Sequence, residues 1–126
     1  MKIYYAHCMA LYGSPQEERD LETIKQLGFE VLNPNTEDVQ EGYLKYKALH
    51  DDNMQYVMQY FCDLVNMCDA LIFRSLPDGS IPSGVAAEIQ AARNSDKLVI
   101  ELPSTILGRT LTLDETREWL RESGQR

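Results

Sequence analysis

The first 32 residues contain an apolar segment, a helix pattern and a second apolar segment, and this order constrains the fold more than any other feature. Residues 2–6 are apolar and β-prone, which is typical of a buried strand. Ser14, a following proline and Glu17 then provide an N-cap and a capping box, and the helix pattern ends at Gly28. A second strand is predicted over residues 29–32. A strand, a helix and a strand at this spacing form a βαβ unit, whose strands pair in parallel through a right-handed crossover.

The rest of the chain continues this alternation. Apolar runs at residues 69–73 and 97–102 predict two more strands, and residues 111–113 are compatible with a short fifth strand. A final helix is predicted to begin at Thr112, which forms a capping box with Glu115. Alternating strands and helices predict an α/β protein, namely a three-layer sandwich with a mainly parallel sheet of four to five strands, flavodoxin- or Rossmann-like.

A long helical pattern runs from residue 50 or 51 to about residue 67. Its apolar stripe is wider than one helix face and is rich in methionine and aromatic residues. Core packing against the sheet explains one face, and the remaining width requires a second partner, for which a second subunit is a candidate. The preceding residues 36–49 fit either a short helix or an irregular segment.

Composition excludes several classes of protein. The length of 126 residues suits a single domain, residues 1–126. A net charge of −8, with no run of Lys or Arg, argues against a nucleic-acid partner. Three cysteines without a CxxC pair predict a reducing compartment, and two histidines make a zinc site improbable. There is no secretory signal pattern and no apolar run near 18 residues, so we expect a cytoplasmic protein without membrane, metal or cofactor.

The stretch from Leu76 to Ala92 has the order of residues expected for a ligand-binding loop. Turn-forming residues that include Asp78 and Gly79 separate the apolar run 69–73 from a helix pattern that begins near Gly84. Ser83 is a natural N-cap, and the free N–H groups that follow it would attract an anion.

Glu88 lies one turn after Gly84 on the predicted helix, at the border of the apolar face. Its carboxylate therefore points over a residue without a side chain, where a ligand has space. The alternative is a solvated glutamate that complements the helix dipole.

Ligands in parallel α/β folds bind beyond the carboxyl ends of the strands. His7 follows the first strand there, and either binds a ligand or hydrogen-bonds the loop backbone. Arg74 follows the third strand, and pairs either with a ligand phosphate or with carboxylates of this acidic chain. Cys8 is more consistent with a small buried residue than with a nucleophile.

Four segments together resemble the nucleoside 2-deoxyribosyltransferase family, which includes related hydrolases of nucleoside 5′-monophosphates. They are Ile3-Tyr4-Tyr5-Ala6, Gly28-Phe29-Glu30-Val31-Leu32-Asn33-Pro34, Cys68-Asp69-Ala70-Leu71-Ile72-Phe73 and Ser83-Gly84-Val85-Ala86-Ala87-Glu88-Ile89. Their order and spacing carry the resemblance, which extends to about Leu102. It implies that Glu88 is the nucleophile that attacks the anomeric carbon and that Tyr4 orients its carboxylate. It also implies active sites completed by a neighbouring subunit, which suits the wide stripe at residues 50–67.

The residue types agree with cleavage of an N-glycosidic bond. An ionised carboxylate stabilises an oxocarbenium-like transition state and can trap the sugar covalently. The helix dipole is expected to keep Glu88 ionised. The resemblance implies an acidic proton donor on the helix before the third strand, for which Asp63 is the candidate, although Phe61 occupies the better-matching position. Pro82 stands where the transferases carry an aspartate, which favours nucleotide hydrolysis or binding without turnover over transfer.

The sequence thus predicts cleavage or transfer at the glycosidic bond of a nucleoside or its 5′-monophosphate. The substrate-binding residues would be His7, Arg74, Asp78, Gly79, Ser83 and Gly84. One alternative is a non-catalytic nucleotide-binding module that uses the same cleft. Another is an interaction protein in which the acidic surface and the methionine-rich helix matter.

Overall fold

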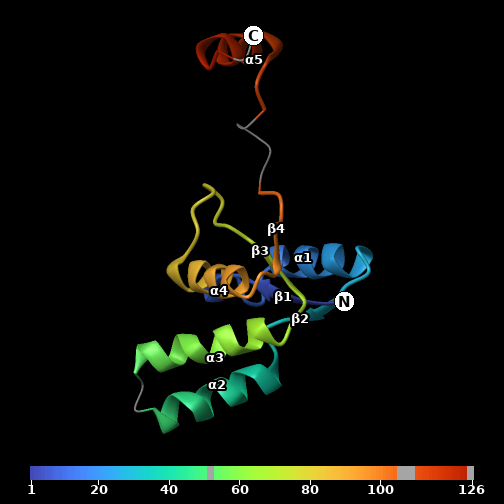
Figure 1. The fold of residues 1–126 in the computed structure, drawn as a ribbon. Helices are drawn as coiled ribbons and strands as arrows, with labels where there is room; N and C mark the ends of the chain where they lie inside the picture. Colours follow the sequence, from blue (N-terminus) through green and yellow to red (C-terminus); the bar gives the residue numbers. More distant parts are fainter. Residues whose placement is uncertain (51–52, 105–109, 125–126) are drawn as a thin grey trace.

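The computed structural model describes residues 1–50, 53–104 and 110–124 (Figure 1). Four strands form one parallel sheet in the order β2-β1-β3-β4. They are β1 (Lys2–Ala6), β2 (Glu30–Leu32), β3 (Ala70–Phe73) and β4 (Leu98–Glu101). In this register Tyr4 pairs with Leu32 on one side and with Leu71 on the other. The predicted α/β class with a parallel sheet is confirmed, and the first strand occupies a central position.

The strands alternate with helices, whose boundaries follow local capping. The helices are α1 (Pro15–Gln26), α2 (Glu37–Leu49), α3 (Met54–Asn66), α4 (Ser83–Asn94) and α5 (Leu113–Glu122), with a short 3-10 turn η1 (Met9–Leu11). The Ser14 side chain accepts a hydrogen bond from the Glu17 amide, as predicted. Gly28, just beyond α1, has the positive φ of +87° that favours glycine after a helix.

Alternate residues of the strands build two separate cores. Tyr4 and Leu71 pack on the face that carries α4 and α3. Tyr5 and Ile72 pack on the opposite face, against Ile24 of α1. Figure 1 shows α1 on one side of the sheet and the α2–α3 pair on the other. This alternation follows from the two-residue period of a β-strand.

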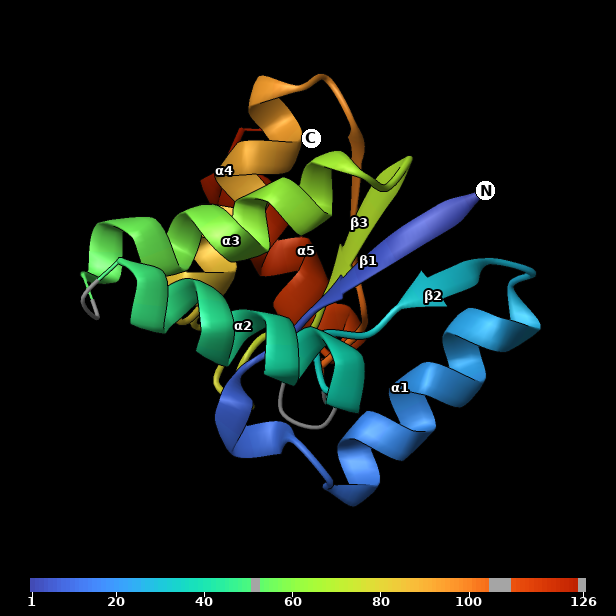
Figure 2. The same ribbon diagram turned by 90° about the horizontal axis from the view of Figure 1, so that it is seen from below.

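Residues 36–49, which the sequence left open, form helix α2 with Thr36 as its N-cap. α2 packs along α3, as Figure 2 shows. The Tyr43 ring lies 5.1 Å from that of Phe61, and the Tyr46 ring lies 5.5 Å from that of Tyr60. The wide apolar stripe on α3 therefore has its second partner within the same chain.

Three boundary predictions differ from the structure. Ser83 is the first residue of α4 rather than its N-cap; Pro82 takes that position, and no side chain caps the helix. Residues 111–113 form no strand, because Leu113 begins α5 behind the Thr112 capping box. The long helix begins at Met54 rather than at residue 50 or 51; residues 51–52 lie outside the described part.

Helix α5 has no buried residue, and Figure 1 shows it apart from the sheet. Trp119 is 54% exposed on this helix. Within the described ranges, no helix combines the length and the apolar character needed to cross a membrane.

Candidate active site

The Tyr4 hydroxyl donates a hydrogen bond to the Glu88 carboxyl inside the protein. Tyr4 belongs to the central strand β1, and Glu88 lies in the second turn of α4. The strand alternation points Tyr4 toward α4, and the helix period points Glu88 toward the sheet together with Val85 and Ile89. Glu88 is only 7% exposed, so the carboxyl that the sequence placed at the border of the helix face is largely buried.

A cavity of about 240 Å³ opens above this pair at the carboxyl end of the sheet. Glu88 and Gly84 line it from α4, and Met58 and Phe61 line it from α3. The other lining residues come from the loop after β1 and from the turn before α4: His7, Cys8, Met9, Tyr12 and Pro82, together with Val85 of α4. The walls are mainly apolar, so the few polar groups would orient a ligand.

Burial raises the pKa of Glu88 to about 7, although the hydrogen bond from Tyr4 opposes that shift. The expectation that the helix dipole keeps this carboxyl fully ionised therefore fails, because desolvation outweighs it. Tyr4 stays protonated, since burial and the adjacent Glu88 raise the pKa of its hydroxyl. Glu88 is thus a carboxyl that changes charge near neutral pH.

His7 lies at the cavity wall but is held by the protein. Its Nε2 is 2.7 Å from Glu17 Oε2, and its Nδ1 is 3.2 Å from the Tyr5 carbonyl. Burial would raise the pKa of Glu17, but hydrogen bonds from His7, Asn35 and Gly13 outweigh it and lower that pKa. Both ring nitrogens thus face oxygen atoms of the protein itself. The sequence predicted Glu17 only as part of a capping box, but its carboxylate binds His7 and Asn35.

Arg74 pairs with a carboxylate, the second of its two predicted alternatives. It donates from Nη2 to Asp20 Oδ1 at 2.6 Å and from Nε to Asp20 Oδ2 at 3.0 Å. A third hydrogen bond, of 2.6 Å, runs from Nη1 to the Pro103 carbonyl. These contacts lie on the α1 face of the sheet, opposite Glu88, because Arg74 continues the alternation of Ile72. Arg74 does not line the cavity above Glu88.

The remaining predicted residues divide between the cavity rim and the surface. Gly84 lines the cavity, and Ser83 is exposed beside it at the start of α4. Asp78 is exposed and accepts hydrogen bonds from the Ser80 amide and hydroxyl, which shapes the turn with Gly79 at a φ of +88°. Asp63 is exposed on α3 and accepts a hydrogen bond from Gln59. The structure does not bring Asp63 to the cavity, and Phe61 of the same helix lines it instead.

Tyr12 is a cavity residue that the sequence did not single out. It ends the short turn η1, and its ring lies 4.9 Å from the His7 ring. Burial and the nearby Glu88 raise the pKa of its hydroxyl. A polar aromatic residue just after the first strand, at the carboxyl edge of the sheet, was the available signal.

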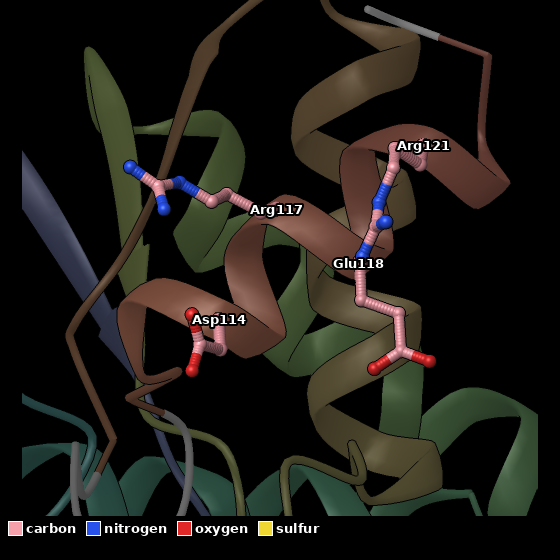
Figure 3. A pocket seen from close by; sticks show the side chains of 4 residues that line it. All are labelled: Asp114, Arg117, Glu118 and Arg121. Carbon is pink, nitrogen blue, oxygen red and sulfur yellow. The ribbon is translucent and has the colours of Figure 1, made fainter.

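A larger hollow, of about 490 Å³, lies on α5 and is a weaker candidate. Figure 3 shows Asp114, Arg117, Glu118 and Arg121, the residues of the described ranges that line it, and these side chains come from that single helix. The space between exposed side chains of one helix encloses no ligand, whereas the cavity at Glu88 draws its walls from three separate parts of the chain.

The described residues contain no cluster of three or more His, Cys, Asp or Glu side chains that could hold a metal ion. Cys8, Cys62 and Cys68 are free thiols. Comparisons of the chain with models of protein families, with curated proteins and with solved structures found no match.

Proposed function

We propose that this protein cleaves or transfers at the N-glycosidic bond of a nucleoside or a nucleoside 5′-monophosphate, with Glu88 as the nucleophile. The observation that carries the proposal is the buried Glu88 carboxyl, which receives a hydrogen bond from Tyr4 at the floor of a cavity of about 240 Å³. The sugar would lie over Gly84, where no side chain intervenes. The apolar wall that includes Met58 and Phe61 suits a flat heterocyclic base.

The chemistry requires the ionised form of Glu88. An oxygen of the carboxylate would attack the anomeric carbon as the bond to the base breaks, giving a glycosyl ester. Water or a second base would then release the sugar. Since the pKa of Glu88 is about 7, the ionised fraction rises through neutral pH, and the rate should rise with it.

The test is chromatography for free base after incubation with a panel of nucleosides and nucleoside 5′-monophosphates, with and without an acceptor base. We expect base release by the intact protein and a loss of at least about a hundredfold in Glu88→Ala. Glu118→Ala, which removes an exposed carboxylate of α5, is the matched control and should release base at the normal rate. No release from any substrate would refute the enzymatic proposal. The dependence on acceptor base separates a transferase from a hydrolase.

One observation favours a second candidate function, nucleotide binding without turnover. Asp63, the predicted proton donor, lies outside the cavity and accepts a hydrogen bond from Gln59. A binding module would show a melting temperature that rises with nucleotide concentration while no base is released. An interaction protein that does not use the cavity would show neither effect.

The proposal includes three finer predictions. The first is a three-layer sandwich of flavodoxin or Rossmann-like type, which the positions of α1 and α4 on opposite faces support. The second is self-association through the helix at residues 50–67, although packing by α2 already accounts for the width of its apolar stripe; light scattering after gel filtration tests it. The third is a cytoplasmic location without a nucleic-acid partner, predicted from composition.

A further inference from the structure

The departing base needs a proton, and this inference about its source rests on the proposed function. Asp63, implied for that role by resemblance, is exposed and outside the cavity. Among the described residues that line the cavity, the side chains with a proton to donate are His7, Cys8, Tyr12 and Glu88. Glu88 must be ionised to act as the nucleophile, so it cannot also be this donor.

We infer that Tyr12 is a catalytic residue that donates its hydroxyl proton to the departing base. Tyr12 lines the cavity with Glu88 and comes from the loop that follows β1 at the carboxyl edge of the sheet. Its hydroxyl makes no hydrogen bond within the described ranges, so it is available to a ligand. The Tyr4 hydroxyl, by contrast, already donates its hydrogen bond to Glu88.

The other donors at the cavity are less suited. His7 directs Nε2 to Glu17 and Nδ1 to the Tyr5 carbonyl, so neither nitrogen faces a ligand. The Cys8 thiol is a weak hydrogen-bond donor compared with a hydroxyl. His7 instead supports Tyr12, because its ring packs between those of Tyr5 and Tyr12, with centroid distances of 3.9 and 4.9 Å. The hydrogen bonds to Glu17 and to the Tyr5 carbonyl thereby fix the His7 ring, against which the Tyr12 ring packs.

The electrostatic surroundings keep Tyr12 protonated before the reaction. Burial is the main cause of its raised pKa, followed by Glu88 of α4 and Glu17 of α1, with smaller contributions from Cys8 and Tyr43. When Glu88 becomes an ester, its negative charge disappears, and the hydroxyl becomes a stronger acid at the moment the proton is needed.

The two half-reactions balance. In the first, the Glu88 carboxylate forms a C–O bond to the anomeric carbon, the electron pair of the C–N bond goes to the base nitrogen, and the Tyr12 proton follows it. In the second, the oxygen of water or a ring nitrogen of an acceptor base forms a bond to the anomeric carbon as the C–O bond to Glu88 breaks, and the electron pair of that bond returns to the carboxylate. The proton of the attacking water or nitrogen goes to the Tyr12 phenolate, so both side chains return to their initial states.

The test compares two substrates that share one sugar. One is the nucleoside or nucleotide that the intact protein cleaves fastest, and the other is the 4-nitrophenyl glycoside of the same sugar, whose leaving group departs without a proton. We expect Tyr12→Phe to slow base release by about 10²-fold or more. In the first turnover on the nitrophenyl glycoside, where only formation of the Glu88 ester is observed, the release of nitrophenolate by Tyr12→Phe should stay within about threefold of the intact protein, because that leaving group does not need the acid. The rates compared are those of this first step for both substrates.

Two controls make the outcomes distinct. Tyr56→Phe removes a hydroxyl from a tyrosine that is 45% exposed on α3, outside the cavity, and should change neither rate. Glu88→Ala should abolish the cleavage of both substrates.

Equal rate losses on the two substrates in Tyr12→Phe, or no loss on either, would overturn the role of Tyr12 while leaving Glu88 as the nucleophile. Full base release by Glu88→Ala, or none by the intact protein, would overturn the proposed function itself, and the role of Tyr12 with it.

Discussion

Tyr4 and Glu88 are separated by 84 positions in the chain and meet because α4 packs on the face of β1 that carries Tyr4. Burial and this hydrogen bond act on the carboxyl in opposite directions, and burial prevails. At the residue scale, the Glu88 carboxyl therefore has a pKa near neutral pH, and removing the Tyr4 hydroxyl should alter its charge at a given pH.

Replacing Tyr4 with Phe removes the hydrogen bond that lowers the pKa of Glu88 and leaves burial unopposed. The pKa of Glu88 should then rise further above 7. The rate of base release would reach half its maximum at a correspondingly higher pH. A pH–rate profile of Tyr4→Phe beside the intact protein measures this shift. An unchanged midpoint would mean that Tyr4 does not act on the charge of Glu88.

At the scale of elements, the pair formed by Arg74 and Asp20 joins α1 to the ends of β3 and β4. Arg74 is 8% exposed and Asp20 is 2% exposed. The Tyr5 hydroxyl also donates to Asp20, at 2.6 Å. Burial would raise the pKa of Asp20, but hydrogen bonds from Arg74, Tyr5 and Gln16 outweigh it and lower that pKa.

Asp20→Asn would leave the buried Arg74 cation without its counter-charge. We expect the free energy of unfolding to fall by about 3–5 kcal/mol, as for other broken buried ion pairs. Urea unfolding followed by circular dichroism measures the loss. Asp63→Asn, at an exposed aspartate, should change the free energy by less than about 0.5 kcal/mol. A small loss in Asp20→Asn would show that the pair contributes little to stability.

Gly42 allows α2 and α3 to approach closely. A Cβ atom added there would collide with the Tyr60 hydroxyl, which donates to the Val39 carbonyl at 2.8 Å. Alanine usually stabilises a helix interior relative to glycine by up to about 1 kcal/mol. Here the collision should reverse the sign, so that Gly42→Ala destabilises the protein by about 1–2 kcal/mol.

Thermal unfolding of a double-mutant cycle checks this prediction. In a Tyr60→Phe background the hydroxyl is absent, and Gly42→Ala should cost less than it does in the intact protein. Equal costs in the two backgrounds would show that the Tyr60 hydroxyl does not set the spacing of the two helices.

At the scale of the whole molecule, stability resides in the two cores on the faces of the sheet. Helix α5 adds no buried residue to them. A chain that ends at Thr112 should therefore unfold with a free energy within about 1 kcal/mol of the full chain, because no residue of α5 is buried. Denaturant titration of the two chains measures the difference. A loss of several kcal/mol would mean that α5 packs against the domain.

The pH dependence of stability also belongs to the whole molecule. The pKa of Glu88 rises from 4.5 to about 7 on folding, so its contribution is complete below pH 4.5 and is lost as the pH rises through 7. The pKa values of Glu17 and Asp20 are lowered on folding. These two carboxylates therefore contribute to the free energy of unfolding at a pH above their pKa values in the unfolded chain, and this contribution is lost as the pH falls through their pKa values in the folded protein.

Glu88→Gln should therefore remove the decline in stability between about pH 4.5 and pH 8, which amounts to roughly 2–3 kcal/mol in the intact protein. The loss of stability in acid should remain in this variant, since it arises from other groups. Melting temperatures across this pH range, for both proteins, measure the effect. Parallel curves for the two proteins would indicate that Glu88 has an ordinary pKa.

Local features of the sequence were sufficient for much of the fold. The apolar runs predicted the four strands to within a residue or two, because a short apolar run bounded by turn-forming or polar residues is recognisable from its own residues. The Ser14 and Thr112 caps were equally local, because a cap joins a side chain to an amide three residues away. Residues 36–49 were left open between a short helix and an irregular segment, because the contacts that settle the choice are those of α2 with α3.

The candidate site divides in the same way. The sequence by itself determined that Glu88 follows a glycine on a helix at the carboxyl edge of a parallel sheet, and resemblance paired it with Tyr4. Only the tertiary structure decided that Glu88 is buried, that Arg74 pairs with Asp20, and that Asp63 is exposed and does not line the cavity. It alone brought Tyr12 to that cavity. The physical reason is that strands and caps depend on neighbours in the chain, whereas burial and the pairing of charges depend on residues that are distant in sequence and meet only when the helices pack on the sheet.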